Sequence, residues 1–302
     1  MLLLSDILNH INPIHFYGDT SLEINGFKSL TDEEVEKRDI SWCSDRNVEY
    51  LKKVRVGTLV VSEIGMEYAK KMSSFNEANW IVVENPKSAF ASILKLYFQQ
   101  QQVYGVDESA SIHENVRYNK ENVFIGKNVV IEKNCQIGDS VIIDHNTVIK
   151  HGTIIKDHVK IGSNCTIGGV GFGYGKKVSG DYELTPHIGN VILNNKVEIG
   201  NNTCVDRAVM GSTILHENVK VDNLVHIAHG VHIGKNSLII ANSMIAGGVK
   251  IGENVWVAPS VSTMQKLQIG SNSTVGLGAV VLKDVDEGEI VVGNPAKLLK
   301  KK

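Results

Sequence analysis

Along most of the chain, apolar side chains recur at every sixth position. The stretch that begins VFIGKN VVIEKN CQIGDS VIIDHN at residue 123 places an isoleucine third in each group, and a small or β-branched residue two positions earlier. An α-helix has a period of about 3.6 residues and a simple strand a period of two, so neither produces this spacing. The repeat runs over residues 123–167, returns at 193–205, and resumes from 215 to 281, where only Thr263 departs from it.

A six-residue repeat of this kind is typical of a three-sided coil, in which a short strand and a turn form each side. Residues i and i+18 then stack about 4.8 Å apart, at the spacing of neighbouring strands. A β-sandwich of short strands is the alternative, but a sandwich does not keep a fixed period over this length. We therefore predict a mainly β protein in which residues 106–285 form a left-handed parallel β-helix. The 28 glycines and the aromatic content of 6% fit many tight turns around a narrow core.

Residues 1–105 lack the repeat and read as an α/β domain that caps one end of the coil. Its pattern predicts an N-terminal helix in LLSDILNHI, strands in TLVVS and NWIVV, and an amphipathic helix in SAFASILKLYF after Asn85 and Pro86. The glutamines at 99–102 suit a linker, and residues 286–302, which end in GNPAKLLKKK, suit a solvated C-terminal tail.

Charge and composition narrow the possible partners. The 31 basic and 33 acidic residues give a net charge of −2, which argues against broad attraction to nucleic acid or to an anionic membrane. No apolar run approaches the roughly 20 residues of a membrane span. The start MLLLSDILNHI lacks the basic region of a signal peptide, and four cysteines do not make a disulfide framework. We therefore expect a cytoplasmic protein.

Candidate chemistry lies where the repeat breaks, because a solenoid accepts insertions only at its turns. The largest break, at 168–187, reads GGVGFGYGKKVSGDYELTPH, and a second lies near VDRAVMGST. Downstream, His226, His229 and His232 follow one another at intervals of three.

The three histidines support two interpretations. A zinc site, as in β-helical carbonic anhydrases, needs them to converge on one point, yet His226 and His232 fall on successive faces of the coil. Alternatively, His229 projects from the turn two residues after the inward Ile227, and Gly247, eighteen residues on, stacks beside it. A general base next to an open backbone N–H is the minimum for acyl transfer.

The chain resembles the UDP-3-O-(3-hydroxyacyl)glucosamine N-acyltransferase family of lipid A biosynthesis. The resemblance rests on the repeat together with GVGFGYG, TPHIGNVILNNKVEIGNNTCVDRA and VDNLVHIAHGVHIG, and on ISWCSDRNVEYL and WIVVENPKSAFASIL in the N-terminal domain. It covers roughly residues 1–285. It implies a homotrimer, with active sites in grooves between subunits, that moves an acyl group from a thioester to the amine of a UDP-linked amino sugar. No bound cofactor or metal is implied; acyl-CoA or acyl carrier protein is the cosubstrate.

The resemblance also implies roles for individual residues. His229 matches the catalytic base, Gly247 the oxyanion position, and Asp222 an acidic position that orients the base or binds substrate. The remaining positions that the resemblance assigns to substrate binding are Trp42, Asn47 and Tyr50 in the N-terminal domain, where the aromatics would hold uracil, and Phe172, Tyr174, His187 and Lys266 in the solenoid.

Departures from the family pattern keep alternatives open. Gly230 follows the base where the family has asparagine, and Gln265-Lys266 replaces a Gly-His pair. The chain closes on GEIVVGNPAKLLKKK, which resembles the tail of acyl-CoA-dependent relatives rather than a helical segment that docks acyl carrier protein. A short-chain, CoA-dependent acylation of a nucleotide-linked amino sugar for O-antigen is thus one alternative. A metal-dependent hydratase and a binding solenoid without activity are the others.

Overall fold

The computed structural model describes residues 2–30, 32, 36–53, 57–99 and 103–301, which form two compact units, Met1–Gln102 and Val103–Lys302. This division falls close to the boundary that the sequence predicts at residue 105.

The first unit is built on a five-stranded sheet in the order β2-β7-β6-β5-β4. Strand β2 runs antiparallel to β7, and the other pairs are parallel. The sheet strands are β2 (His15–Tyr17), β4 (Gly26–Phe27), β5 (Asp39–Trp42), β6 (Thr58–Val61) and β7 (Asn79–Val82), and β1 (Leu2–Leu3) pairs with β3 (Glu23–Ile24). The helices are α1 (Leu4–Ile11), η1 (Asp45–Lys53), α2 (Glu63–Ala69), η2 (Phe75–Glu77), α3 (Pro86–Ile93) and η3 (Leu94–Phe98).

Alternation along the central strands sends side chains into two separate cores. Val60 and Ile81 pack with residues of α1 and α3 on one face, whereas Leu59 and Trp80 pack with residues of α2 and η1 on the other. The two strands and the helix predicted from TLVVS, NWIVV and SAFASILKLYF are present as β6, β7 and α3. Asn85 caps α3, because its side chain accepts a hydrogen bond from the backbone N–H of Ser88 at 3.0 Å.

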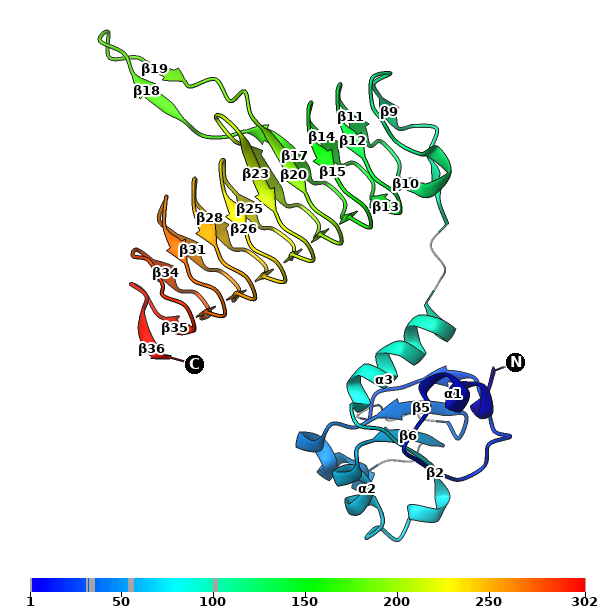
Figure 1. The fold of residues 1–302 in the computed structure, drawn as a ribbon. Coiled ribbons are helices and arrows are strands. Elements are labelled where there is room, and N and C mark those ends of the chain that lie inside the picture. The colour runs from blue at the N-terminus through cyan, green and yellow to red at the C-terminus, as the bar shows by residue number, and fades with distance from the viewer. Residues whose placement is uncertain (1, 31, 33–35, 54–56, 100–102, 302) are drawn as a thin grey trace. The chain divides into compact units, whose positions relative to one another are not determined.

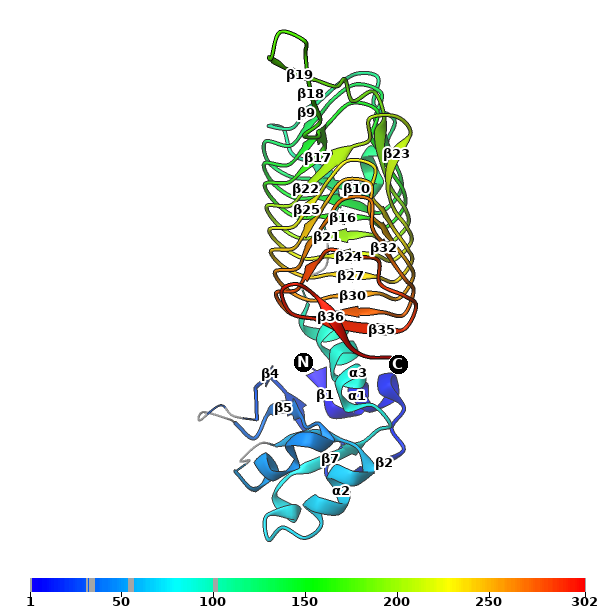
Figure 2. The same cartoon turned by 90° about the vertical axis from the view of Figure 1, so that its left-hand side faces the viewer.

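The second unit is a prism with three faces, each a sheet of short strands from successive coils (Figures 1 and 2). The first face contains β8 (Gly105–Val106), β10 (Val123–Ile125), β13 (Val141–Ile143), β16 (Lys160–Ile161), β21 (Glu198–Ile199), β24 (Lys220–Val221), β27 (Leu238–Ile239), β30 (Trp256–Val257), β33 (Thr274–Val275), β35 (Glu289–Val292) and β36 (Lys297–Lys301). The second contains β9 (Ser111–Ile112), β11 (Val130–Ile131), β14 (Val148–Ile149), β17 (Thr166–Val170), β22 (Cys204–Arg207), β25 (His226–Ile227), β28 (Met244–Ile245), β31 (Ser262–Thr263) and β34 (Val280–Val281). The third contains β12 (Gln136–Ile137), β15 (Ile154–Ile155), β20 (Asn190–Leu193), β23 (Ser212–Leu215), β26 (His232–Ile233), β29 (Lys250–Ile251) and β32 (Gln268–Ile269). A short 3₁₀ turn, η4 (Lys120–Asn122), precedes β10.

The register follows the predicted 18-residue coil. Val123 pairs with Val141, and Ile227 with Ile245, in parallel strands. The inward side chains form one continuous core, in which Ile125, Ile143 and Ile161 are fully buried. Many corners place asparagine in the left-handed backbone conformation, as at Asn128 (φ 56°) and Asn146 (φ 60°). Asparagine tolerates this conformation better than other residues with a side chain, which explains its recurrence in the repeat.

The two breaks lengthen single coils without disturbing the stack. Ile155 pairs with Leu193 across the first break, and Val205 pairs with Ile227 across the second. The first break carries an antiparallel hairpin of β18 (Tyr174–Lys176) and β19 (Tyr182–Leu184), which projects from the stacked coils (Figure 1).

The last described residues form a strand that is exposed to solvent. Strands β35 and β36 pair antiparallel and extend the first face, although every residue of β36 is exposed. Its lysines are typical of an edge strand protected against further pairing.

Candidate active site

His229 lies at a corner of the prism, in the turn that follows β25. The buried Ile227 anchors this strand in the core. Beyond it, the N–H of Gly230 (φ 69°) donates to Oγ1 of Thr213 at 2.9 Å, and the carbonyl oxygen of His229 accepts from the N–H of Gly248 at 2.9 Å. Because the carbonyl of His229 and the N–H of Gly230 are both hydrogen-bonded, the backbone that carries the half-buried imidazole is fixed in position.

Gly247 lies on the next coil, directly against this imidazole. A Cβ atom on Gly247 would lie 2.7 Å from Nε2 and 2.8 Å from Cε1 of His229, so only glycine leaves the ring in place. The carbonyl oxygen of Gly247 accepts from the N–H of Lys266 at 2.9 Å. Its own N–H has no hydrogen-bond acceptor among the described residues. A base and a free N–H donor therefore lie side by side, as the 18-residue coil predicts.

The pKa of His229 is lowered from its ordinary value of 6.5. Partial burial is the main cause, because it disfavours the charged ring, and the neighbouring His187 adds a smaller effect of the same sign. The rings of His187 and His229 meet edge to face, with their centroids 5.3 Å apart. His229 is therefore neutral at neutral pH, which is the protonation state that a general base requires.

The inserted segment between β17 and β20 brings His187 to this corner. Its glycine-rich start passes over both rings, since a Cβ on Gly171 would lie 2.9 Å from Nε2 of His187 and 3.0 Å from Cδ2 of His229. The rings of Phe172 and Tyr174 contact each other with centroids 5.0 Å apart. Phe172 is 87% exposed, so both side chains are available to a ligand or another protein.

A buried arginine holds the root of this segment. Arg207 is only 1% exposed, and its Nε donates to the carbonyl oxygen of Gly168 at 2.7 Å. Its Nη2 donates to the carbonyl oxygen of His151 at 3.0 Å, and its Nη1 lies 2.5 Å from Nε2 of the same histidine. These contacts stabilise the departure of the insertion from the stack, and with it the approach of His187 to His229.

Asp206, a residue that the sequence did not single out, lies near this corner and pairs with His226. Asp206 is 9% exposed, and its Oδ2 lies 3.6 Å from Nε2 of His226. Burial raises the pKa of Asp206, while His226 and His187 oppose the increase. The irregular spacing in VDRAVMGST is the sequence feature that could have indicated this pair. The longer coil changes which residues of β22 and β25 lie side by side, as Val205 and Ile227 do.

Asp222 and Lys266 occupy different positions relative to His229. Asp222 accepts hydrogen bonds from Asn223, at 2.8 Å from both its backbone N–H and its Nδ2, and from the N–H of Ala241 at 3.3 Å. Among the described residues no hydrogen bond joins Asp222 to His229, and its role in orienting the base or binding substrate stays a prediction. Lys266 is exposed and lies one coil beyond Gly247, in the same corner column.

The predicted uracil-binding residues lie at the end of β5 and in η1. Trp42 is half-buried, and its ring lies against that of Phe90 with centroids 6.5 Å apart. Asn47 and Tyr50 are exposed, and Asn47 departs from helical geometry (φ −117°, ψ 15°). Part of Trp42 is thus committed to packing, whereas the other two side chains are free to meet a ligand.

The histidine triplet is not arranged as a metal site. His226 lies on β25 of the second face and His232 on β26 of the third, and His229 lies in the turn between them. Within the described ranges, no group of three His, Cys, Asp or Glu side chains is placed to hold a metal ion.

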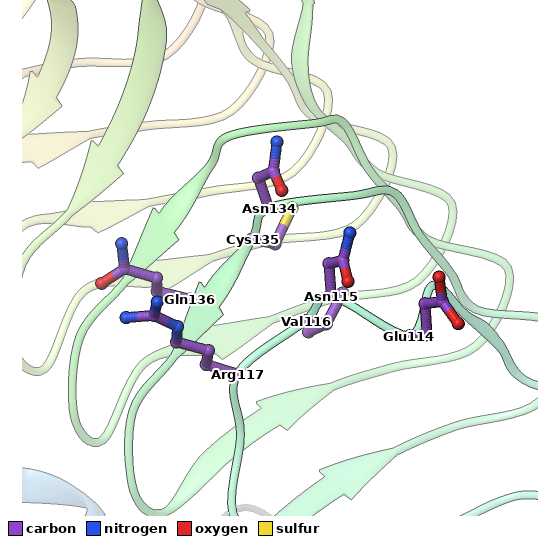
Figure 3. A pocket seen from close by; sticks show the side chains of 7 residues that line it. All are labelled: Glu114, Asn115, Val116, Arg117, Asn134, Cys135 and Gln136. Atoms are coloured by element: carbon purple, nitrogen blue, oxygen red, sulfur yellow. The ribbon is translucent and has the colours of Figure 1, made fainter.

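A pocket of about 580 Å³ lies on the first coils of the prism, and Figure 3 shows the residues that line it. Its lining residues are Glu114, Asn115, Val116, Arg117, Asn134, Cys135 and Gln136. The pocket residues 134–136 closely follow β11, and His229 closely follows β25. On the second face, β14, β17 and β22 lie between these two strands. The pocket therefore has no part in the His229 corner. Among the described helices, none has the length and apolar composition needed to cross a membrane.

Comparisons with known proteins place this geometry in a family. The model of the bacterial transferase hexapeptide (six repeats) matches residues 120–151, 134–169 and 212–247. The structures of LpxA from Acinetobacter baumannii and of UDP-N-acetylglucosamine acyltransferase from Francisella novicida align with TM-scores of 0.57 and 0.60 at 22% and 21% identity. Each alignment covers 65% of this chain and, respectively, 74% and 70% of the solved chain. At this identity they bear on the fold alone, and they confirm the predicted left-handed parallel β-helix.

The sequence relatives are more informative. UDP-3-O-acylglucosamine N-acyltransferase of Campylobacter lari is 38% identical over 299 residues, which cover 95% of this chain and 91% of the relative. The protein of the same name from Caulobacter sp. is 39% identical over 145 residues, or 48% of this chain and 42% of the relative. The predicted acyltransferase class is thereby confirmed, and the chain belongs to the UDP-3-O-acylglucosamine N-acyltransferase family.

Proposed function

We propose that this protein transfers an acyl group from a thioester to the amine of a UDP-linked amino sugar, such as a UDP-3-O-acylglucosamine, in lipid A-type biosynthesis. The observation that carries the proposal is the contact between the His229 imidazole and Gly247 on the next coil. Relatives of this name that align over nearly the whole chain supply the substrate class.

The chemistry follows from these two groups. Neutral His229 accepts a proton from the substrate amine as its nitrogen attacks the thioester carbonyl. The carbonyl oxygen becomes negative in the tetrahedral intermediate, and the free N–H of Gly247 donates a hydrogen bond to it. When the intermediate collapses, the C–S bond breaks, the sulfur leaves as a thiol after taking a proton, and an amide remains. The His229 proton is the available source for that sulfur.

Residues outside the reacting centre have proposed binding roles. Trp42, Asn47 and Tyr50 hold the uridine, and Phe172, Tyr174 and His187 hold the sugar or the acyl chain. The exposure of Phe172 and Tyr50 supports a role in contact with ligands or with another subunit. A homotrimer with active sites between subunits gives Asp222 and Lys266 access to a neighbouring chain's site. The protein is expected to act in the cytoplasm.

The donor is either an acyl carrier protein or acyl-CoA. A short-chain acylation that serves O-antigen synthesis would use the same two catalytic groups.

The test crosses both donor classes with a panel of UDP- and dTDP-linked amino sugars. The assay measures free thiol released and the mass of the product. The proposal predicts an amide product from a UDP-linked amino sugar, formed by wild-type protein and not by His229→Ala. Thiol release without sugar acylation, or binding of the nucleotide sugar without any thioester consumption, would contradict it.

A further inference from the structure

His187 presents a buried hydrogen-bonding atom that lacks a partner. The side chain belongs to a residue that is 8% exposed, and its Nδ1 lies 2.7 Å from the carbonyl oxygen of Thr185. Because a carbonyl oxygen only accepts, Nδ1 must carry the proton, and in the neutral ring Nε2 is an acceptor. No donor among the described residues reaches Nε2. An unpaired buried acceptor is unfavourable, so a donor is expected from outside this set of residues.

This atom faces the space next to His229. A Cβ on Gly171 would lie 2.9 Å from Nε2 of His187, and one on Gly173 would lie 3.1 Å from Cε1 of the same ring. Neither glycine has a left-handed backbone conformation, so their backbone geometry alone does not require glycine. Their missing side chains instead let the backbone of this segment pack directly against the rings, as the backbone of Gly247 does beside Nε2 of His229.

We propose that Nε2 of His187 accepts a hydrogen bond from an O–H or N–H group of the amino-sugar substrate, and that this bond orients the sugar toward His229. The inference rests on the proposed function. Nε2 is buried in the free protein, so the glycine-rich segment over the ring must move for the donor to reach it. A neutral lone pair attracts hydroxyl and amine hydrogens and repels the anionic oxygens of a diphosphate. The uridine also carries donors, but the proposed function assigns it to Trp42, Asn47 and Tyr50, which leaves a hydroxyl or amine of the sugar as the partner of His187.

The experiment compares the binding of UDP-3-O-acylglucosamine and of UDP by calorimetry, using the full chain. His187→Phe keeps a planar ring but removes the acceptor, and we expect it to weaken binding of the sugar nucleotide at least tenfold while UDP binds unchanged. His187→Gln, whose amide oxygen can accept, should recover part of the affinity. The matched control is His232→Phe, which removes a ring nitrogen that lies 3.2 Å from the carbonyl oxygen of Ser212 on another face, and should leave both affinities unchanged.

Equal sugar-nucleotide affinity in His187→Phe and wild type would overturn the inference while leaving the proposed function intact. An equal loss for UDP and for the sugar nucleotide would also overturn it, because the residue would then support the fold. Failure of wild-type protein to bind the sugar nucleotide would instead remove the proposed function, and this inference with it. Should His187→Phe not fold, ¹⁵N NMR of wild-type His187 provides a second test. Its Nε2 resonance should move upfield when the sugar nucleotide is added and stay unchanged with UDP.

Discussion

Substitution of Gly247 by alanine tests the central contact of the site directly. The new Cβ would lie 2.7 Å from Nε2 of His229, whereas an ordinary contact begins near 3.4 Å, so the imidazole must retreat by about 0.7 Å. The backbone of Gly247 is not left-handed, and alanine fits its conformation. The strain therefore falls on the catalytic ring rather than on the fold.

A misplacement of about 1 Å in an active site can cost on the order of 100-fold in rate. We accordingly expect Gly247→Ala to lower kcat about 100-fold, equivalent to about 2.7 kcal/mol of lost transition-state stabilisation, with a nearly unchanged Tm. The assay follows thiol release under saturating donor and acceptor, and thermal unfolding by circular dichroism reports on the fold.

Gly175→Ala is the matched control for this substitution. Gly175 is also outside the left-handed region, but a Cβ there would meet no atom within 4 Å. Its kcat should stay within about twofold of wild type. If Gly247→Ala kept near-normal kcat, or if the control lost as much activity, the geometric reasoning would be refuted.

Three further predictions concern the base and its support. His229→Ala should reduce kcat by roughly 10²–10⁴-fold with an unchanged circular dichroism spectrum, and retention of more than a tenth of the activity would rule out its role as base. Because burial and His187 lower the pKa of His229, and only the neutral ring accepts a proton, the acid limb of the kcat/KM–pH profile should have its midpoint below 6.5; a midpoint above 6.5 would conflict with this environment. Arg207→Leu should destabilise the protein by about 2–4 kcal/mol in urea unfolding, since it leaves the buried carbonyl oxygen of Gly168 and the partly buried one of His151 without this donor. Arg38→Leu, which breaks an exposed pair with Glu23, should cost less than about 1 kcal/mol, and equal losses in the two variants would contradict the account.

The six-residue repeat made the prism predictable because it links each residue to one neighbour, eighteen positions away. The same rule placed Gly247 against His229, and it held at pairs such as Val123 and Val141. The turns could also be predicted from single residues, because the asparagines at the corners adopt left-handed backbone conformations that few other residues accept.

The rest of the site depends on where the repeat is interrupted. His187 lies 42 residues before His229, at the end of an insertion whose path follows no period in the sequence. The Arg207 anchor also joins residues with a separation of 56, which depends on how the insertion leaves the stack. The role of Asp222 remains a prediction from the family motif, and its hydrogen bonds within the chain go to Asn223 and Ala241.

A crystal structure with the amide product bound provides the most direct measurement of the catalytic arrangement. We predict that the amide nitrogen lies about 3 Å from Nε2 of His229, and that the carbonyl oxygen lies at a similar distance from the backbone nitrogen of Gly247. A product whose amide binds away from this corner, or whose carbonyl oxygen points away from Gly247, would contradict the assignment of base and oxyanion donor.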